Sequence, residues 1–350
     1  MNRFMNLDQA LIGMSKNILE FGVWRQVRGF DCLEIPHPVM IEIINPTDRY
    51  ITIEERKWNK ILPVAESLWM ALGLNDLNSL PGRYVKNLYN FSDNGRTWRG
   101  GYGPRLRGFS GIGSDYDISE PQHRHIRSGF VKSVDQLDYV IKSLKRDINT
   151  RQAIIQFGDP VKDSFENSVD LKTTKDYPCS RTLQFMMVDG KLNCTLFIRS
   201  NDILFGLSAV NVTNFTIMQE YVANIVGVPV GNYYHIANNL HVYKEHLEKI
   251  RLFASLEPFE YERGLRFEYM DHFESLEHFE RLCNNLYQWE KGIWNGEYPL
   301  EPIMFGHDMI DDWALCFLKA QDPDNDTRFT NPYLNNLWKV KGSQEEPFGN

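Results

Sequence analysis

The stretch 176–202 constrains the fold of this chain more than any other part of the sequence. Two runs of apolar and β-branched residues flank an Asp-Gly pair at 189–190. Such a pair predicts a β-hairpin, because both central residues of a type I′ turn have positive φ. Cys179 precedes the first predicted strand, and an Arg-Ser-x-Asp cluster follows the second, namely Arg199, Ser200 and Asp202. We therefore expect a thiol and this polar cluster at the same end of a hairpin.

The composition indicates a globular protein without general affinity for polyanions. Of the 350 residues, 42% are apolar and 13% aromatic, which suffices for one large core or two modest ones. The formal net charge of −8 argues against general binding of nucleic acid or of an anionic membrane surface, so a bound phosphate needs locally placed arginines. The five cysteines form no C-x-x-C pair, which argues against a disulfide framework or structural zinc and leaves a thiolate nucleophile open.

The chain shows no internal repeat and no clear linker. We therefore expect a single domain over residues 1–320, with insertions near 108–130 and 161–175 and a polar, mobile C-terminal tail at 321–350. No segment has the pattern of a signal peptide or the apolar length that spans a bilayer. These features predict a cytoplasmic location without membrane association, which is compatible with a bacterial or phage-infected cell.

Hydrophobic periodicity places the main helices. Apolar residues recur at helical spacing in 5–22, 58–74, 133–147 and 212–226, and in two further stretches within 272–320. Residues 151–157 predict a strand. Residues 23–29, which carry Arg28 beside a glycine, predict a mobile loop that is either a solvated turn or a phosphate clamp.

Three other segments carry polar groups of the kinds that take part in catalysis or ligand binding. Glu66 lies within an apolar string, where it is either a structural ion-paired residue or a carboxyl with a raised pKa that acts as general acid or base. Glycines around Tyr102 predict a tight turn that fixes the phenol. His241 and Tyr243 belong to a His/Asn-rich segment whose spacing does not match a zinc motif, so we expect no metal and a polar ligand instead.

These fragments, taken in order, resemble the thymidylate synthase family over roughly residues 7–255. Each fragment is weak alone, but their order and spacing agree. The fragments are Glu66-x-x-Trp69, Tyr102-Gly103, Pro178-Cys179, Arg199-Ser200-x-Asp202, Gly206-Leu207, Asn211 and His241-x-Tyr243.

The resemblance implies the fold and the reaction. The expected fold is α/β (α+β), a single domain with a large twisted mixed β-sheet flanked by helices, which forms a homodimer packed sheet against sheet. The expected activity is one-carbon transfer to C5 of a pyrimidine nucleoside monophosphate, with 5,10-methylenetetrahydrofolate as co-substrate and no metal. Cys179 would add to C6 of the ring, and Arg199 would lower the pKa of its thiol.

The resemblance also implies a role for each remaining residue. Glu66 and Tyr102 would carry out the proton transfers around O4 and C5, while Asn211 would hydrogen-bond to the edge of the pyrimidine. Asp202 would act in catalysis and orient the folate, with Trp69 and Gly206 beside it. The phosphate would be held by Arg28, Arg199 and Ser200, and by Arg151 of the neighbouring subunit. His241 and Tyr243 would bind the 3′-hydroxyl of the sugar.

Several departures from the family pattern shape the functional expectation. The family has two arginines where this chain has Arg151-Gln152, Ser180 stands where a His is common, and the segment 207–211 is one residue longer than usual. The apolar terminal tail that closes the synthase site is also absent from the polar C-terminus. Since closure excludes water during reduction, we expect 5-hydroxymethylation, with thymidylate synthase as the alternative.

Base choice and two other functional classes stay open at this point. An Asn amide at 211 can read uracil or, flipped, cytosine, and Asn rather than Asp favours uracil; dUMP, dCMP and CMP are all candidates. A hydrolase built on Cys179, His241 and Asp202 has suitable residue types but leaves the Arg-Ser pair without a task. A silent nucleotide- or RNA-binding relative is the remote alternative.

Overall fold

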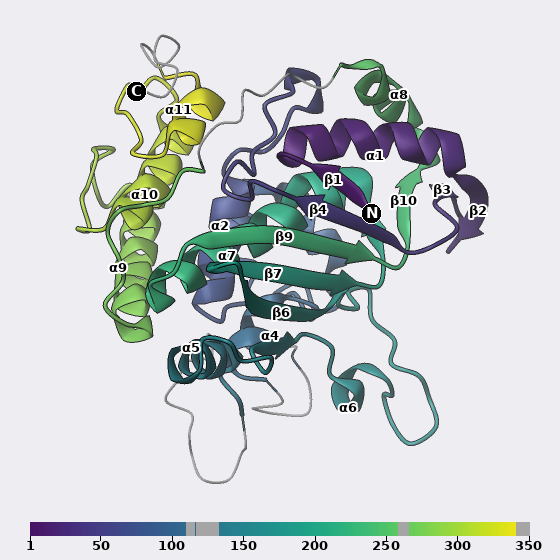
Figure 1. The fold of residues 1–350 in the computed structure, drawn as a ribbon, viewed down its shortest axis with the longest axis horizontal. Coiled ribbons are helices and arrows are strands. Elements are labelled where there is room, and N and C mark those ends of the chain that lie inside the picture. Colours follow the sequence, from purple (N-terminus) through teal and green to yellow (C-terminus); the bar gives the residue numbers. More distant parts are fainter. Residues whose placement is uncertain (110–115, 117–132, 258–265, 341–350) are drawn as a thin grey trace. The chain divides into compact units, whose positions relative to one another are not determined.

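The structure, a computed structural model, describes residues 1–109, 116, 133–257 and 266–340 (Figure 1). Most of the insertion expected near 108–130 lies outside the described residues. The chain forms two compact units that we describe separately. Unit one comprises Met1–Pro63, Met187–Met270 and Asp324–Asn350, and unit two comprises Val64–Met186 and Asp271–Pro323.

A six-stranded mixed sheet is the main β-structure, in the order β1-β4-β9-β7-β6-β5. β4 and β9 are antiparallel, whereas the β1–β4 and β7–β9 pairs are parallel, as a mixed sheet requires. The strands are β1 (Asn2–Phe4), β4 (Val39–Ile43), β5 (Ile154–Gln156), β6 (Ser180–Val188), β7 (Lys191–Ile198) and β9 (Val230–Ala237). The mixed sheet with flanking helices confirms the predicted fold class.

The predicted hairpin at the centre of the sequence is confirmed. β6 ends at Val188, β7 begins at Lys191, and both turn residues have positive φ, 49° at Asp189 and 74° at Gly190. These values fit the type I′ turn that an Asp-Gly pair favours. Cys179 directly precedes β6 and Arg199 directly follows β7.

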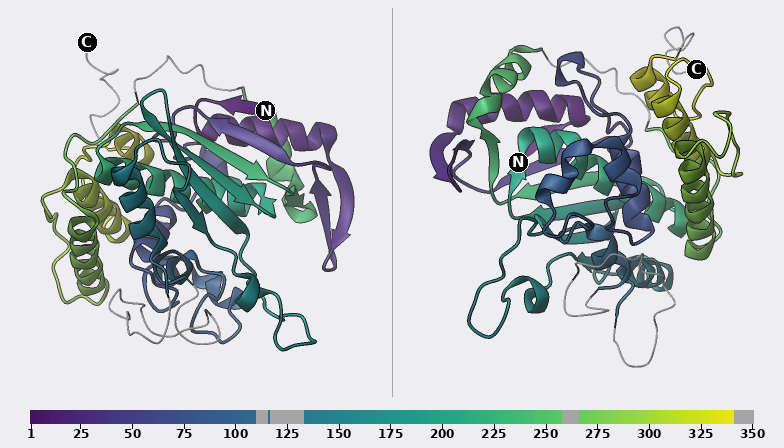
Figure 2. Two further views of the ribbon diagram at one scale, coloured as in Figure 1. Left: turned by 60° about the horizontal axis from the view of Figure 1, so that its bottom comes forward. Right: turned by 180° about the vertical axis from the view of Figure 1, so that it is seen from behind.

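The helices of unit one follow the apolar periodicity of the sequence. α1 (Leu7–Phe21) begins at Asn6, whose side chain accepts a hydrogen bond from the amide of Gln9, and it packs against α8. α7 (Val212–Val226) is buried on nearly every side, packs against β7 and β9, and ends at Gly227 with φ 82° (Figures 1 and 2). The other helices are η1 (Glu54–Arg56), η3 (Ile203–Asn211), η4 (Lys244–His246), α8 (Leu247–Ser255) and α11 (Pro332–Trp338).

A second sheet in unit one has the order β2-β3-β10-β8. Its strands are β2 (Val23–Val27), β3 (Phe30–Glu34), β8 (Asn201–Asp202) and β10 (Leu240–Tyr243). The prediction of a mobile loop at 23–29 is wrong, because this segment forms β2 and the turn of a hairpin. The alternation of β-branched and aromatic residues with arginines suits a strand, and Arg28 (φ 53°) and Gly29 (φ 84°) make the turn.

The C-terminal tail is partly helical, which corrects the expectation of a mobile segment. α11 begins with Asn331, whose side chain accepts from the amide of Tyr333, followed by Pro332 at the first helical position. Asn331 and Pro332 are here the signals of a helix start. Apolar side chains anchor this helix in the core, namely Phe329, Tyr333, Leu334, Leu337 and Val340.

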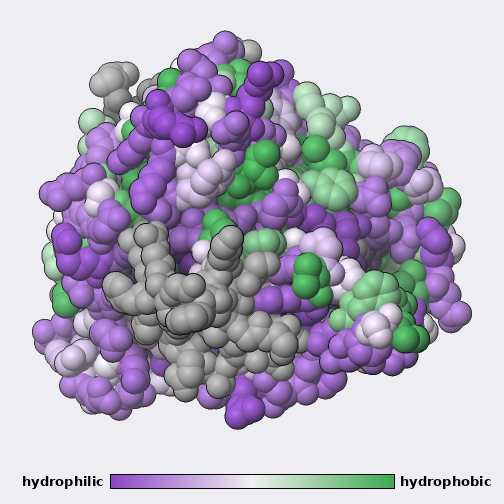
Figure 3. Space-filling model, turned by 90° about the horizontal axis from the view of Figure 1, so that it is seen from below, coloured by the Kyte–Doolittle hydropathy of each residue, from purple (hydrophilic) through white to green (hydrophobic). Residues whose placement is uncertain are grey.

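The helices of unit two confirm the remaining periodic segments. Its elements are α2 (Leu62–Ala71), which starts at the unit boundary, α3 (Leu80–Tyr84), η2 (Lys86–Phe91), α4 (Tyr102–Arg107), α5 (Gln136–Arg146), α6 (Pro160–Asp163), α9 (Leu276–Trp294) and α10 (Asp308–Gln321). None of the helices in the described ranges has the length and apolar character that crossing a bilayer requires. Figure 3 shows one face of the surface, where hydrophilic residues surround separate hydrophobic patches.

Candidate active site

The predicted site residues are divided between the two units. Unit two contains Cys179, Glu66, Trp69, Tyr102 and Arg151. Unit one contains the residues expected to bind phosphate, sugar and folate, and the base-reading residue, namely Arg28, Arg199, Ser200, Asp202, Gly206, Asn211, His241 and Tyr243.

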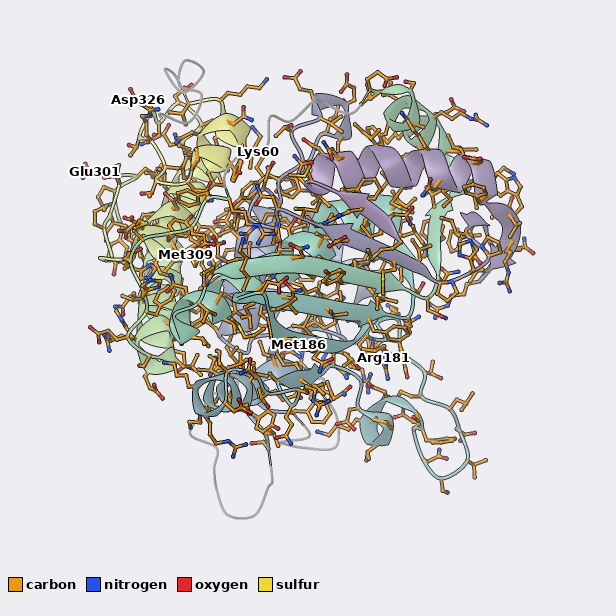
Figure 4. All side chains as sticks on the ribbon, in the orientation of Figure 1. Lys60, Arg181, Met186, Glu301, Met309 and Asp326 are labelled. Carbon is orange, nitrogen blue, oxygen red and sulfur yellow. The ribbon has the colours of Figure 1, made fainter. Side chains whose placement is uncertain are left out.

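Cys179 lies half-buried at the start of β6. Its Sγ atom is 3.8 Å from the carbonyl oxygen of Tyr177, and the guanidinium of Arg181, labelled in Figure 4, lies 5.3 Å from the centre of the Tyr177 ring. The next backbone amide, that of Ser180, donates to the Tyr102 hydroxyl at 3.1 Å. Cys179 therefore lies on a braced segment and is not fully buried, which suits a nucleophile.

Tyr102 is fixed by its position at the start of α4. Its ring lies 5.0 Å from that of Phe157, and burial, followed by the charge of the Cys179 thiolate, raises the pKa of the phenol well above its ordinary value. The hydroxyl is therefore protonated at neutral pH and can donate a hydrogen bond. The expected tight turn at Tyr102 is instead the beginning of a short helix.

Gly103 holds α4 close to the turn after α2. A Cβ atom at this position would lie 2.2 Å from the carbonyl oxygen of Leu74, a backbone atom that cannot rotate away. We expect Gly103→Ala to lower the free energy of unfolding by about 1–3 kcal/mol, because overpacked sites must shift their backbone. Displacement of Tyr102 should also lower turnover.

Urea denaturation and a turnover assay test this prediction. Gly95→Ala is the matched control, since a Cβ there meets no atom within 4 Å although φ is 70°. It should lose about 1 kcal/mol of stability through backbone strain alone and keep its turnover. Equal effects of the two substitutions would contradict the role assigned to Gly103.

Asp176 is a residue of this region to which the sequence analysis gave no role. Its Oδ2 atom accepts a hydrogen bond of 2.7 Å from the amide of Gly100, and burial raises the pKa of its carboxyl to about 6. It thereby ties the segment before Cys179 to the segment before Tyr102. The one sequence feature that could have pointed to Asp176 is its position in the stretch 176–202.

Glu66 and Trp69 lie in α2, where both are buried, with 7% and 2% of their surface exposed. The Trp69 ring packs 6.1 Å from that of Trp98. Arg151 is exposed ahead of β5, and its carbonyl oxygen accepts from the side chain of Gln184 at 3.0 Å. Gln184 is five residues along β6 from Cys179, a separation of roughly 16 Å at about 3.3 Å per residue. Arg151 is therefore remote from the thiol of its own chain.

In unit one, the pairing of β8 with β10 brings together Asp202 and His241, which are partners in register. The Nδ1 atom of His241 lies 2.8 Å from Oδ1 of Asn239, and its ring is edge-on to that of Tyr243 at 5.4 Å. Burial lowers the pKa of His241 to about 4. The imidazole is therefore neutral at physiological pH and suits hydrogen bonding to a hydroxyl rather than charge pairing.

Asp202 caps the π-helix η3. Its Oδ1 atom accepts from the amides of Leu204 and Phe205 at 2.7 and 2.6 Å. Arg56 braces the same turn, since its Nη2 atom donates to the carbonyl oxygen of Leu204 at 2.7 Å. Burial raises the pKa of the Asp202 carboxyl to about 6, against the lowering effect of these amides and of Arg56.

The raised pKa of Asp202 predicts a pH-dependent stability. Between about pH 4 and 6 the native state binds a proton that the unfolded state has already released, so the free energy of unfolding falls as pH rises through this window. Asp202→Asn keeps the capping oxygen but not the charge. We expect it to gain stability relative to the wild type between pH 4 and pH 7, by on the order of 2–3 kcal/mol. Urea denaturation at both pH values measures the difference, and a pH-independent difference would contradict the prediction.

The π-helix η3 includes segment 207–211, where the sequence analysis expects one residue more than usual. A π-helix fits one extra residue into helical structure and is often found at functional sites. η3 ends at Asn211, whose Oδ1 atom accepts from the side chain of Asn201 at 3.0 Å. The buried Gly206 adjoins both side chains, because a Cβ there would lie 2.2 Å from Asn201 Nδ2 and 3.0 Å from Asn211 Oδ1.

The residues expected to bind phosphate lie at two ends of strands in unit one. Arg199 and Ser200 follow β7 and are half-buried. Arg28 is exposed in the turn between β2 and β3, and the ring of Phe30 beside it lies 5.9 Å from that of Tyr243. The described residues contain no group of three or more His, Cys, Asp or Glu side chains that could hold a metal ion.

Comparison with known proteins decides the family. A family model described as thymidylate synthase matches residues 10–288. The chain belongs to the thymidylate synthase family. The resemblance drawn from the ordered motifs is thereby confirmed.

The relatives of this thymidylate synthase family member carry the names of two different enzyme activities. It is 37% identical to the deoxyuridylate hydroxymethyltransferase of Bacillus phage SP01 over 67% of this chain and 56% of the relative. It is 32% identical to the protein of the same name from Pseudomonas phage M6, over 72% of this chain and 64% of the relative. The thymidylate synthase of equine herpesvirus 2 is 30% identical over 62% of this chain and 73% of the relative. The chain thus spans roughly half to two-thirds of the length of the phage relatives.

Proposed function

We propose that this protein transfers a one-carbon unit to C5 of deoxyuridine 5′-monophosphate and forms the 5-hydroxymethyl nucleotide. The observation that carries the proposal is a partly exposed cysteine beside a fixed tyrosine in a chain of this family. The names of the two phage relatives favour hydroxymethylation and a deoxyuridylate substrate.

Cys179 is the proposed nucleophile. Its thiolate forms a bond to C6 of the pyrimidine, and the electron pair of the C5–C6 double bond moves toward C5 and O4. C5 thereby becomes nucleophilic. We assign the proton transfers around O4 and C5 to Tyr102 and to the buried carboxyl group of Glu66.

Unit one supplies the proposed binding groups for the nucleotide. We assign the 5′-phosphate to Arg28, Arg199 and Ser200, since guanidinium groups pair with phosphate oxygens. The neutral imidazole of His241 and the Tyr243 hydroxyl suit the 3′-hydroxyl of the sugar. Asn211 is the proposed reader of the pyrimidine edge.

The family implies 5,10-methylenetetrahydrofolate as co-substrate, which supplies a carbon at the formaldehyde oxidation level. The donor set of unit one fits such a molecule. Asp202 offers a buried carboxylate for N–H donors, and the exposed ring of Phe205 next to it offers apolar surface for a flat heterocycle. We assign Asp202 and Gly206 to the folate, together with Trp69 of unit two.

A homodimer is part of the proposal. Arg151 is exposed ahead of β5, and its hydrogen-bond partner on β6, Gln184, lies roughly 16 Å along that strand from Cys179. We therefore assign Arg151 to the phosphate that is bound by the neighbouring subunit of the dimer. Sedimentation of the protein with and without nucleotide would test the dimer directly.

Thymidylate synthase activity is the second candidate, favoured by the herpesvirus relative of that name. The folate product separates the two reactions. Hydroxymethylation leaves tetrahydrofolate, whereas reductive methylation oxidises the folate to dihydrofolate. We expect no rise in the absorbance of dihydrofolate during turnover of dUMP, and such a rise would establish the second candidate instead.

A further inference from the structure

A chain of four polar side chains, three of them deeply buried or fully enclosed, ends at Asn211. The Tyr233 hydroxyl lies 3.1 Å from Nδ1 of His235, and Nε2 of His235 lies 3.0 Å from Oδ1 of Asn201. Asn201 in turn donates from Nδ2 to Oδ1 of Asn211 at 3.0 Å. His235 and Tyr233 are 0% exposed and Asn201 is 2% exposed, while Asn211 is half-buried.

The hydrogen bonds run in one direction along this chain. The amide of Asn201 directs its Oδ1 atom at Nε2 of His235 and donates from Nδ2 to Oδ1 of Asn211. In the His235 tautomer that suits this orientation, Nε2 carries the proton and donates to Asn201, and Nδ1 accepts from the Tyr233 hydroxyl. Burial lowers the pKa of His235 to about 3, so the ring is neutral and carries one proton, which the orientation of the Asn201 amide places on Nε2. The oxygen of the Asn211 amide consequently faces Asn201, and its NH2 group points elsewhere.

Reversal of the Asn211 amide alone is unfavourable. It would bring its NH2 group against that of Asn201, which leaves two donors facing each other without an acceptor. A reversal without this conflict requires Asn201 to flip and His235 to change tautomer at the same time. Gly206 leaves the space for the bond between the two amides, since a Cβ would occupy it.

We propose that Asn201 is a positioning residue that fixes the amide orientation of Asn211 and thereby selects uracil over cytosine. This inference rests on the proposed function, in which Asn211 reads the base. Uracil presents an N–H donor at N3 and an acceptor at O4, and cytosine presents an acceptor at N3 and a donor at N4. An amide that presents its oxygen to N3–H and its NH2 group to O4 matches uracil. The reversed amide matches N3 and the N4 amino group of cytosine.

Two substitutions separate this role from a purely structural one. Asn201→Ala frees the Asn211 amide to rotate, so discrimination between dUMP and dCMP should fall about tenfold because one oriented hydrogen bond is lost. In Asn201→Asp, the new carboxylate can accept hydrogen bonds from both His235 and the Asn211 NH2 group. It should reverse the amide and shift the preference toward dCMP.

The measurement is the dissociation constant of each nucleotide for the full chain, by isothermal titration calorimetry. Asn193→Ala is the matched control, because Asn193 accepts a hydrogen bond from the amide of Asn232 and belongs to β7 without joining the polar chain. It should leave the dUMP to dCMP ratio unchanged. Thermal unfolding of each variant identifies those that fail to fold.

The outcomes distinguish the inference from the proposed function. A wild type that prefers dUMP, with a reduced ratio in Asn201→Ala and an inverted one in Asn201→Asp, supports both. A wild type that prefers dUMP while both variants keep the same ratio overturns the role of Asn201 alone. A wild type that binds neither nucleotide overturns the proposed function and, with it, the inference.

Discussion

Replacement of Cys179 by alanine is expected to lower kcat with dUMP by roughly 10³-fold or more, because loss of a nucleophile removes the covalent route rather than one stabilising contact. The dissociation constant for dUMP should change only a few-fold, since the proposed phosphate and sugar contacts come from unit one. Turnover assays and calorimetric titration measure the two quantities separately.

Cys283→Ala is the control for this substitution. Cys283 lies in α9 and is 0% exposed, so its loss should cost some packing stability and leave kcat within a factor of about two. A Cys179→Ala variant that keeps more than about a tenth of the wild-type kcat would remove the covalent mechanism.

Asp163→Ala is expected to cause the largest loss of stability, about 3–5 kcal/mol, because it removes the carboxylate that two buried arginines share as a hydrogen-bond acceptor. Asp163 is 1% exposed and accepts two hydrogen bonds from Arg105 at 2.8 Å each. Arg99 also donates to it at 3.1 Å. Arg105 and Arg99 are 0% and 2% exposed, so both guanidinium groups are shielded from bulk water. Urea denaturation gives the change in free energy of unfolding.

Asp138→Ala provides the surface comparison in the same unit. Asp138 pairs with Lys142 one helical turn along α5 at 2.7 Å, and the lysine side chain is 68% exposed. Solvent and salt screen such a pair, so the expected loss is below about 0.5 kcal/mol. Similar losses for the two aspartates would contradict the importance of burial in this network.

Local patterns predicted most of the regular structure. α1, α5, α7, α9 and α10 agree with the apolar periodicity, and the Asp-Gly turn defines the β6–β7 hairpin. The errors at β2 and α11 have a common cause. Both segments contain residues typical of loops, such as Gly29 and Pro332, which here form a tight turn and a helix start. Sequence alone does not distinguish these uses, because the outcome depends on which apolar side chains the core accepts.

The site was predictable as an ordered set of motifs but not as a hydrogen-bond network. The motifs gave the family, which the comparison confirmed, and the roles of the individual residues stay proposals. The chain from Tyr233 to Asn211 was missed because Asn201 occupies the variable position of Arg-Ser-x-Asp and His235 lies on a different strand. A bond between distant segments has no signature in residue spacing. The π-helix was signalled only by the extra residue in 207–211.

The central claim is hydroxymethyl transfer to C5 of dUMP, and mass analysis of the nucleotide product tests it most directly. The protein is incubated with methylenetetrahydrofolate and with dUMP, dCMP or CMP in parallel. We predict a gain of CH2O on dUMP, with much less conversion of the cytosine nucleotides and none in the Cys179→Ala variant. A gain of CH2 on dUMP, or no modification of any of the three nucleotides, would contradict it.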